Sequence, residues 1–339
     1  MSTFIIAELS ANHNHDLQLA KKTILAAKEA GADAVKLQTY TADTLTLDCD
    51  KPHFKTGAGL WEGTTLYKLY QEAYTPWEWH EELFSYGRSL GLVMFSAPFD
   101  YTAVDFLEGL DNPIYKIASF EAMDYPLIEY AAAKGKPMII SLGLLSLEET
   151  EEMIAACRKV GNDDITLLIC TSQYPAKPED AQLLKIGDIK QRFGVKVGLS
   201  DHTMGSAVAG AAVALGACVI EKHFILDRDM GGVDSAFSMN PQEFREMVDN
   251  IRIIEKAVSA PDYTKVSSGR EGARSLFVVK DMRKGEAFTA ENIRSIRPGA
   301  GLHPKYYPQV LGLVAACDIE RGTPLEKSMI FDPTFFCGA

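Results

Sequence analysis

Residues 4–16, FIIAELSANHNHD, decide between the two folds that the rest of the chain allows. The apolar run Phe4–Ala7 ends in the carboxylate of Glu8, and a polar loop with two histidines follows before a helical pattern begins at Leu17. A doubly wound sheet usually carries a Gly-x-Gly-x-x-Gly loop after its first strand. None follows Glu8, so this stretch favours a β/α barrel, in which the carboxyl ends of the strands carry the active site.

The following residues repeat the same alternation of a short apolar run and a longer helical pattern. Helix-capping patterns begin at Thr75, Ser146 and Asn240, and the amphipathic segment Leu17–Ala30 stops before Gly31. Eight such units predict an α/β fold, a (β/α)₈ TIM barrel that spans residues 1–258. The predicted strands are Phe4–Glu8, Ala34–Gln38, Val93–Ser96, Ile114–Ala118, Met138–Leu142, Ile165–Cys170, Val195–Ser200 and Cys218–His223.

Two segments depart from this alternation. Residues 41–74 are long for a connection between a strand and a helix, and their aromatic residues and glycines predict a lid or a subunit contact. Residues 259–272 are polar and contain Gly and Ser, which predicts a linker. Residues 273–339 then predict a small β-rich domain, with strands in SLFVVKDM, AFTAENIRSIRPG and LVAACDI.

The bulk composition excludes several classes of function. The chain has 339 residues and a formal net charge of −12, which argues against nucleic acid, because Lys and Arg contacts to phosphate dominate that affinity. No apolar run approaches the roughly 20 residues of a membrane helix, and the N-terminal run predicts no signal peptide. Six cysteines without a Cys-x-x-Cys pair are typical of reduced thiols, so we expect a cytoplasmic protein.

Polar side chains gather at the ends of nearly all the predicted strands. Residues two apart share a face of a strand, so Glu8 and the pair Lys36 and Gln38 can point to one mouth of the barrel. We expect the same of the polar residue Ser96. One such residue alone would indicate little, but the whole set predicts a site. The further members are Lys116, Ser119, Glu121, Ser141, Tyr174, Ser200, His202, Glu221, His223 and Asp234.

Two chemistries are indicated within this set. His202 and His223 lie 21 residues apart, so adjacent strand ends must bring them together. Two imidazoles completed by water and substrate suit an exchangeable divalent ion, Mn²⁺ first with Mg²⁺ or Co²⁺ as alternatives, better than a closed zinc site. Ammonium and hydroxyl donors on Lys36, Lys116, Ser119, Ser141 and Ser200 suit a phosphate group. A buried Glu8 beside them is costly unless it binds a sugar hydroxyl or transfers protons.

These residues lie in motifs that resemble the sialic acid synthase family, a barrel followed by an antifreeze-like (SAF) domain. The matching stretches include FIIAELSANHNHD, EAYTPWEW, FSAPFD, YKIASFE, VGLSDHT, ALGACVIEKHF and SIRPGAGLHPKYY, and together they span almost the whole chain. Within the family, Leu9-Ser10-Ala11 after the first glutamate, LQTYT and DSAFS resemble the branch that makes pseudaminic acid. N-acetylneuraminate or legionaminic acid synthesis is the alternative within the family.

The resemblance implies an enzyme that condenses phosphoenolpyruvate with an N-acetylated sugar, here 2,4-diacetamido-2,4,6-trideoxy-L-altrose, and releases phosphate. It implies that Glu8, His202 and His223 are catalytic, with the metal on the two histidines. It implies a domain-swapped homodimer, in which Arg297 of the small domain reaches the partner subunit's site. The implied phosphoenolpyruvate ligands are Lys36, Lys116, Ser119, Ser141 and Ser200, and the implied sugar ligands are Gln38, Glu121, Tyr174, Glu221, Asp234 and Arg297.

Some positions depart from the family pattern, and other functions compete. Ser172 stands where an asparagine is common, Ala97 where a threonine is common, and ISLGL replaces ISTGM. A related synthase that acts on a phosphorylated sugar needs a second cationic cluster, which the sequence does not offer. A non-catalytic sugar-binding or assembly protein with this fold would not need the histidine pair or Glu8.

Overall fold

The computed structural model describes residues 2–57, 61–264 and 269–331, and it confirms the predicted barrel. Eight parallel strands close in sequence order, with β8 paired to β1. The observed bounds lie within two residues of the predicted ones. The strands are β1 (Phe4–Glu8), β2 (Ala34–Thr39), β3 (Val93–Pro98), β4 (Tyr115–Ile117), β5 (Met138–Ser141), β6 (Ile165–Cys170), β7 (Lys196–Asp201) and β8 (Val219–His223).

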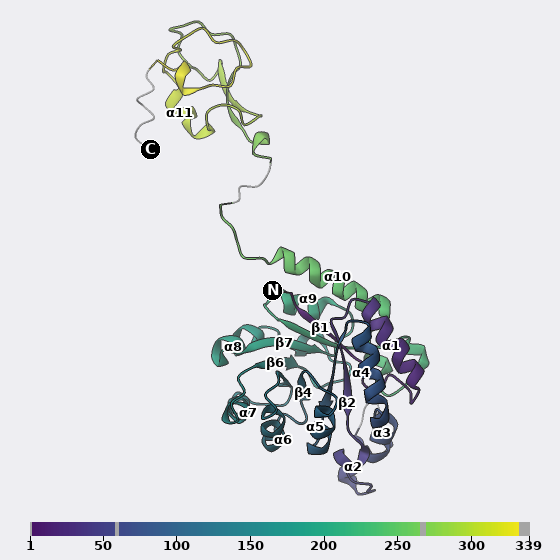
Figure 1. Ribbon diagram of the computed structural model, residues 1–339. Helices are drawn as coiled ribbons and strands as arrows, with labels where there is room; N and C mark the ends of the chain where they lie inside the picture. The colour runs from purple at the N-terminus through teal and green to yellow at the C-terminus, as the bar shows by residue number, and fades with distance from the viewer. Residues whose placement is uncertain (1, 58–60, 265–268, 332–339) are drawn as a thin grey trace. The chain divides into compact units, whose positions relative to one another are not determined.

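Helices surround the barrel on the outside, as Figure 1 shows. The capping boxes predicted at Ser146 and Asn240 are present, each closed by a glutamate three residues later. The one predicted at Thr75 is wrong, because a short 3₁₀ turn precedes the helix and the Thr75 hydroxyl bonds to His13 instead. The outer helices are α1 (Leu17–Glu29), α4 (His80–Ser89), α5 (Tyr101–Glu108), α6 (Tyr125–Ala132), α7 (Leu147–Lys159), α8 (Lys185–Phe193), α9 (Ala207–Ala214) and α10 (Pro241–Ala257).

Strand alternation separates two apolar layers. One parity packs against the helices in the main core, for example Ala7 and Leu37. The other parity fills the barrel interior with Ile6, Ala34, Phe95, Ile139, Leu168 and Val219. The interior is closely packed at Gly198, where an added Cβ would lie 2.4 Å from the carbonyl oxygen of Val219. Polar residues that continue the interior parity past these apolar residues therefore emerge at the mouth of the barrel.

The long connection after β2 is ordered in its described residues. It contains α2 (Ala42–Leu45), a 3₁₀ turn at Pro52–Phe54 and α3 (Leu66–Ala73). Trp61 ties it to the barrel, because its indole nitrogen donates to the carbonyl oxygen of Val233, 3.0 Å away in the loop after β8. The described residues of this connection are therefore part of the barrel's rim.

The chain divides into two compact units, Met1–Ser259 and Ala260–Ala339. In the second unit, β9 (Ser275–Val278) pairs antiparallel with β10 (Ile293–Ile296), and a short helix, α11 (Tyr307–Val310), follows. The third strand predicted in LVAACDI is wrong, because that segment forms only isolated bridges such as Met282 to Ile319 and Ala287 to Val314. Residues 265–268 of the predicted linker and 332–339 of the predicted small domain lie outside the described residues. No helix in the described parts of the chain is both long and apolar enough to span a membrane.

Candidate active site at the mouth of the barrel

The strand register brings the predicted site residues together. Glu8 at the end of β1 lies opposite Lys36 of β2 on one side and opposite His223 of β8 on the other. Ser200 of β7 lies opposite Glu221 of β8. All five side chains belong to residues that are at least nine-tenths buried, so the site is a recessed floor.

Two lysines and two carboxylates form the charged part of this floor. Lys36 Nζ lies 2.9 Å from Glu8 Oε2 and 3.5 Å from Glu221 Oε1. Lys116 Nζ lies 3.9 Å from the same Glu221 oxygen and donates to the Ser141 hydroxyl at 2.7 Å. Glu221 therefore faces both ammonium groups, and its single negative charge compensates their two positive charges only in part.

Burial and these neighbours set the protonation of the floor. Burial raises the pKa of Glu8 to about 7, although Lys36 opposes this. Burial also acts on Glu221, but Lys116 and Lys36 outweigh it and lower the pKa of that carboxyl. The ionised Glu221 faces two cations while Glu8 exchanges a proton near neutrality, so the floor favours an anionic ligand.

A hydrogen-bonded chain leads from the floor to the loop after β8. Gln38 Nε2 donates to Glu8 Oε1 at 2.8 Å and to Ser10 Oγ at 3.0 Å, and the Ser10 hydroxyl donates to Asp234 Oδ2 at 2.5 Å. Ser10 has a φ of +47°, in the left-handed region that non-glycine residues rarely adopt. Strand parity places Ser10 on the same face as Glu8, but the sequence predicts no individual role for it, because the reversal of the chain that aims its hydroxyl leaves no signal in residue type.

His202 and His223 meet, as the sequence predicts, with ring centroids 5.3 Å apart. His202 Nδ1 lies 2.9 Å from the carbonyl oxygen of Thr171, so Nε2 is the nitrogen with a lone pair whenever the ring is neutral. Burial opposes the charged ring, but Cys170 and the Thr171 carbonyl outweigh it and raise the pKa of His202. His223 Nδ1 is buried without a hydrogen-bond partner, and burial beside His202 lowers its pKa well below the usual value. Two aromatic rings pack against this pair. The ring centroid of Tyr174 lies 4.4 Å from that of His202, and the ring centroid of Phe237 lies 4.9 Å from that of His223.

The two imidazoles fit an exchangeable divalent ion. A metal ligand must be a neutral imidazole, and Nδ1 of His223 has no hydrogen-bond partner, although Asp234 Oδ2 lies 3.8 Å away. Among residues 2–57, 61–264 and 269–331, no group of three or more His, Cys, Asp and Glu side chains is placed to hold a metal. The protein therefore offers two ligands, and the remaining positions suit water and substrate oxygens.

Two further predicted residues line the mouth with unsatisfied polar atoms. The Ser119 hydroxyl is buried without a partner, and so is Oε2 of Glu121, whose pKa burial raises to about 7. Gly143 makes room for the hydroxyls of Ser119 and Ser172, because a Cβ at this position would lie 2.8 Å from Ser119 Oγ and 2.2 Å from Ser172 Oγ. Such unpaired buried groups indicate that a ligand completes the site.

Some polar residues at the strand ends point away from the mouth. Ser96 was expected at the site, and this is wrong: its hydroxyl lies 2.7 Å from that of Thr39, on the parity that packs against the helices. Asp201 and Lys222 form a buried ion pair on that same side at 2.7 Å. Lys222 Nζ also donates to the carbonyl oxygen of Thr203 at 2.6 Å, which fixes the loop that carries His202. Residue types alone do not predict this support.

The remaining predicted residues lie farther out. Tyr174 and Asp234 line the pocket described below, and Arg297 is an exposed residue directly after β10 in the second unit. His15 Nε2 lies 2.9 Å from the carbonyl oxygen of Glu72, at the end of α3. The loop after β1 is therefore tied to the connection that follows β2.

A pocket of about 640 Å³ opens above this floor. Its polar side includes Ser10, Gln38, Glu121, His223 and Asp234. Its apolar lining includes Leu45, Leu66 and Leu69 from α2 and α3, which we call the α2–α3 wall.

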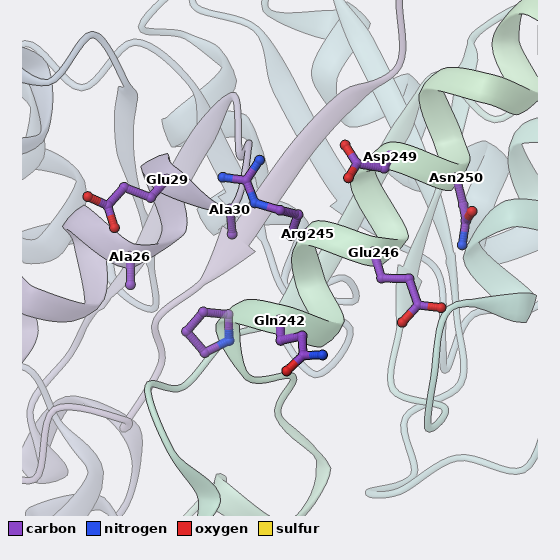
Figure 2. Close-up of a pocket in the computed structure, with 9 residues that line it drawn as sticks. Ala26, Glu29, Ala30, Gln242, Arg245, Glu246, Asp249 and Asn250 are labelled. Carbon is purple, nitrogen blue, oxygen red and sulfur yellow. The ribbon is translucent and has the colours of Figure 1, made fainter.

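A second hollow of about 570 Å³ lies between α1 and α10 (Figure 2). The lining of that second hollow, which includes Glu29, Arg245 and Asp249, contains none of the predicted site residues.

Comparison with known proteins gives matches along nearly the whole chain. The NeuB family model matches residues 23–263, and the SAF domain model matches residues 273–330. A pseudaminic acid synthase of Helicobacter pylori is 50% identical over 330 residues, which cover 96% of this chain and 97% of the relative. An N,N'-diacetyllegionaminic acid synthase of Legionella pneumophila is 37% identical over 334 residues, which cover 96% of this chain and 94% of the relative. The crystal structure of an N-acetylneuraminic acid synthetase of Leptospira borgpetersenii, in complex with citrate, superposes with a TM-score of 0.72 at 30% identity, covering 80% of this chain and 90% of that one.

Proposed function

The chain belongs to the NeuB family, and on that premise we propose that it condenses phosphoenolpyruvate with 2,4-diacetamido-2,4,6-trideoxy-L-altrose. Water is consumed, and pseudaminic acid and phosphate are released. The observation that carries the proposal is the 50% identity, over nearly the full length, to a pseudaminic acid synthase. The charged floor and the histidine pair supply the groups that such a carbon–carbon bond formation requires.

The two lysines suit phosphoenolpyruvate. Lys36 and Lys116 present ammonium groups to one recess, where Glu221 faces both of them and Glu8 pairs with Lys36. Hydroxyls of Ser119, Ser141 and Ser200 lie around them as neutral donors. A phosphate and a carboxylate together would complete this cationic, hydrogen-bonding set.

The histidines suit the sugar aldehyde. We assign His202 and His223 as ligands of a divalent ion, Mn²⁺ first, with Mg²⁺ or Co²⁺ as alternatives, which when bound supplies Lewis-acid polarisation of a carbonyl oxygen. His202 is oriented by the Thr171 carbonyl. Tyr174 and Phe237 exclude water from one side of the ring pair.

The carboxylates suit the proton transfers. In the reaction, C3 of phosphoenolpyruvate forms a bond to the aldehyde carbon, whose oxygen takes a proton. Water then adds at C2 and loses one proton. The C2–O bond to phosphate breaks as the new C2 hydroxyl loses its proton to the departing phosphate, which leaves the C2 ketone. Glu8, with a pKa near 7, is suited to accept or return that proton, while Gln38 and Lys36 hold its two oxygens. Gln38, Glu121, Tyr174, Glu221 and Asp234 would bind the sugar or the water.

Synthesis of N-acetylneuraminate or legionaminic acid is the alternative reaction. The legionaminic acid relative is more distant, at 37% identity. A sugar-binding or assembly protein that retains the fold would leave the proton-exchanging Glu8 and the buried histidine pair without a purpose. We also propose a cytoplasmic homodimer in which Arg297 of one subunit reaches the sugar in the other.

The test is phosphate release from phosphoenolpyruvate with Mn²⁺. The diacetamido-altrose and N-acetylmannosamine are supplied in parallel, with and without a chelator. We expect turnover of the altrose alone, lost with chelator and restored by excess Mn²⁺. Turnover of N-acetylmannosamine alone would move the enzyme to sialic acid synthesis, and no turnover of any nonulosonate precursor would favour the binding protein.

A further inference from the structure

The pocket above the floor has two chemically different sides. Polar residues at the strand ends contribute one part of its lining, and the α2–α3 wall contributes three leucines, to which the loops after the strands add Phe99 and Phe120. Tyr40 and Tyr70 border this wall and meet edge to face, with ring centroids 5.8 Å apart. A ligand that fills the pocket must therefore offer apolar groups to the wall and polar groups to the strand ends.

The wall does not belong to the hydrophobic core. Leu45, Leu66 and Leu69 are each partly exposed, and none belongs to the apolar clusters of the described residues, two of which lie in the first unit and one in the second. Burying apolar surface is favourable, so three leucines that stay outside the core while lining one cavity retain surface for a ligand. Leu47, in the same connection, is 61% exposed and does not line the pocket.

The orientation of the sugar follows from the chemistry at the floor, and this step rests on the proposed function. The aldehyde carbon must lie at the histidine pair and the lysines, where the new bond forms. The opposite end of the six-carbon chain then extends away from the floor into the pocket. In a 2,4,6-trideoxy sugar this end is a methyl group, whereas in mannosamine-type hexoses it is a hydroxymethyl group.

We propose that the α2–α3 wall is the specificity surface that binds the C6 methyl group of the sugar, so that the enzyme discriminates against hexoses with a 6-hydroxyl. An apolar surface rejects an added hydroxyl only moderately, by about 10- to 100-fold in kcat/KM. The wall thus accounts for a preference of that size and no larger. The residues responsible are Leu66 and Leu69 on α3, with Leu45 on α2 completing the surface.

The experiment compares two sugars that differ only at C6. Phosphate release is measured with 2,4-diacetamido-2,4,6-trideoxy-L-altrose and with its 6-hydroxy analogue, for wild type, Leu66→Asn, Leu69→Asn and the matched control Leu47→Asn. Milder variants, Leu66→Ala and Leu69→Ala, are measured as well, and thermal melting verifies that each protein is folded. The kcat/KM ratio between the two sugars is the readout, because a general loss of activity does not change it.

We expect wild type and Leu47→Asn to prefer the 6-deoxy sugar by about 10- to 100-fold. Leu66→Asn and Leu69→Asn should bring that ratio close to one, mainly through a higher KM for the 6-deoxy sugar, and the alanine variants should lie between. Wild-type turnover with the same ratio in every variant, or without any preference, would overturn the specificity role and leave the proposed function intact. Absence of wild-type turnover with either sugar would overturn both.

Discussion

At the scale of single residues, the site depends on a few side chains that connect distant parts of the chain. Ser10 is the clearest case, because its hydroxyl accepts from Gln38 and donates to Asp234, 224 positions away in the sequence. The backbone of Ser10 adopts a strained left-handed conformation, with a φ of +47°, to place the hydroxyl there. The hydroxyl therefore orders two predicted sugar ligands at once without charge of its own.

Replacing Ser10 by glycine separates this hydroxyl from folding. Glycine adopts a positive φ without strain, so the free energy of unfolding should change by less than about 1 kcal/mol. Turnover should fall about 10- to 100-fold, as expected for losing hydrogen bonds to a charged group. Asn14→Gly, at φ +44° and exposed, controls for relief of strain. Unchanged kcat and KM in Ser10→Gly would show that the hydroxyl orders nothing of consequence.

Glu121 gives a stability prediction with a defined sign. Because burial raises its pKa to about 7, the folded protein prefers the protonated carboxyl. The corresponding stability is present below the unfolded pKa of 4.5 and is lost as pH rises through about 7. Glu121→Gln stays neutral and lacks this pH dependence. From pH 5 to pH 8 the unfolding free energy of wild type should therefore fall relative to that of Glu121→Gln, by at most about 3 kcal/mol.

Urea unfolding at both pH values measures this difference. Glu151→Gln, on the exposed side of α7, controls for loss of a carboxylate. A difference between Glu121→Gln and wild type that is the same at pH 5 and pH 8 would contradict the burial argument.

At the scale of elements, β8 performs two tasks with consecutive residues. Glu221 and His223 face the mouth, while Lys222 between them faces the helices and binds Asp201. The same ammonium holds the carbonyl oxygens of Thr203 and Gly205. The strand thus fixes both its own histidine and the loop that carries the other.

Lys222→Met tests this support. Leaving the buried Asp201 without its partner should cost about 3–5 kcal/mol of unfolding free energy. Mn²⁺ affinity, measured by electron paramagnetic resonance, should fall about tenfold, since supporting partners orient metal ligands. Lys196→Met removes the exposed pair with Asp164 and should cost at most about 1 kcal/mol. If Lys222→Met leaves Mn²⁺ affinity unchanged, the pair has no influence on the histidines.

Much of the fold and part of the site could be predicted from such alternation. The apolar runs located all eight strands to within two residues, and strand-end parity identified Glu8, Lys36 and His223. Ser96 was misplaced because residue type does not tell which parity faces inward at a strand's last positions. Ser10 and the α2–α3 wall were missed because backbone reversals and the path of a long connection depend on tertiary packing.

At the scale of the whole molecule, the two units raise the question of which barrel each small domain serves. The proposed homodimer places Arg297 of one subunit at the site of the other. That arrangement makes the active site a product of two chains, so two defective subunits should complement each other.

Mixing Glu8→Gln with Arg297→Ala tests complementation. Each homodimer should be nearly inactive, but co-expression should restore about a quarter of wild-type activity, since half of the dimers carry one intact site. Light scattering measures the dimer mass, and a Glu8→Gln protein mixed with Tyr174→Ala, which lies in the same unit, is the control. Equal activity of both mixtures would indicate that each small domain serves its own barrel.

The alternation in β8 has a consequence for re-engineering and for the natural drift of this sequence. Removing or adding one residue in Val219–His223 would turn Lys222 into the pocket and both Glu221 and His223 toward the helices. Such a change destroys the charge pattern and the core together, so no graded intermediates exist. The described residues of the connection 41–74 contribute no strand to the barrel, so a designer who seeks new sugars should exchange that connection as a cassette and leave β8 untouched.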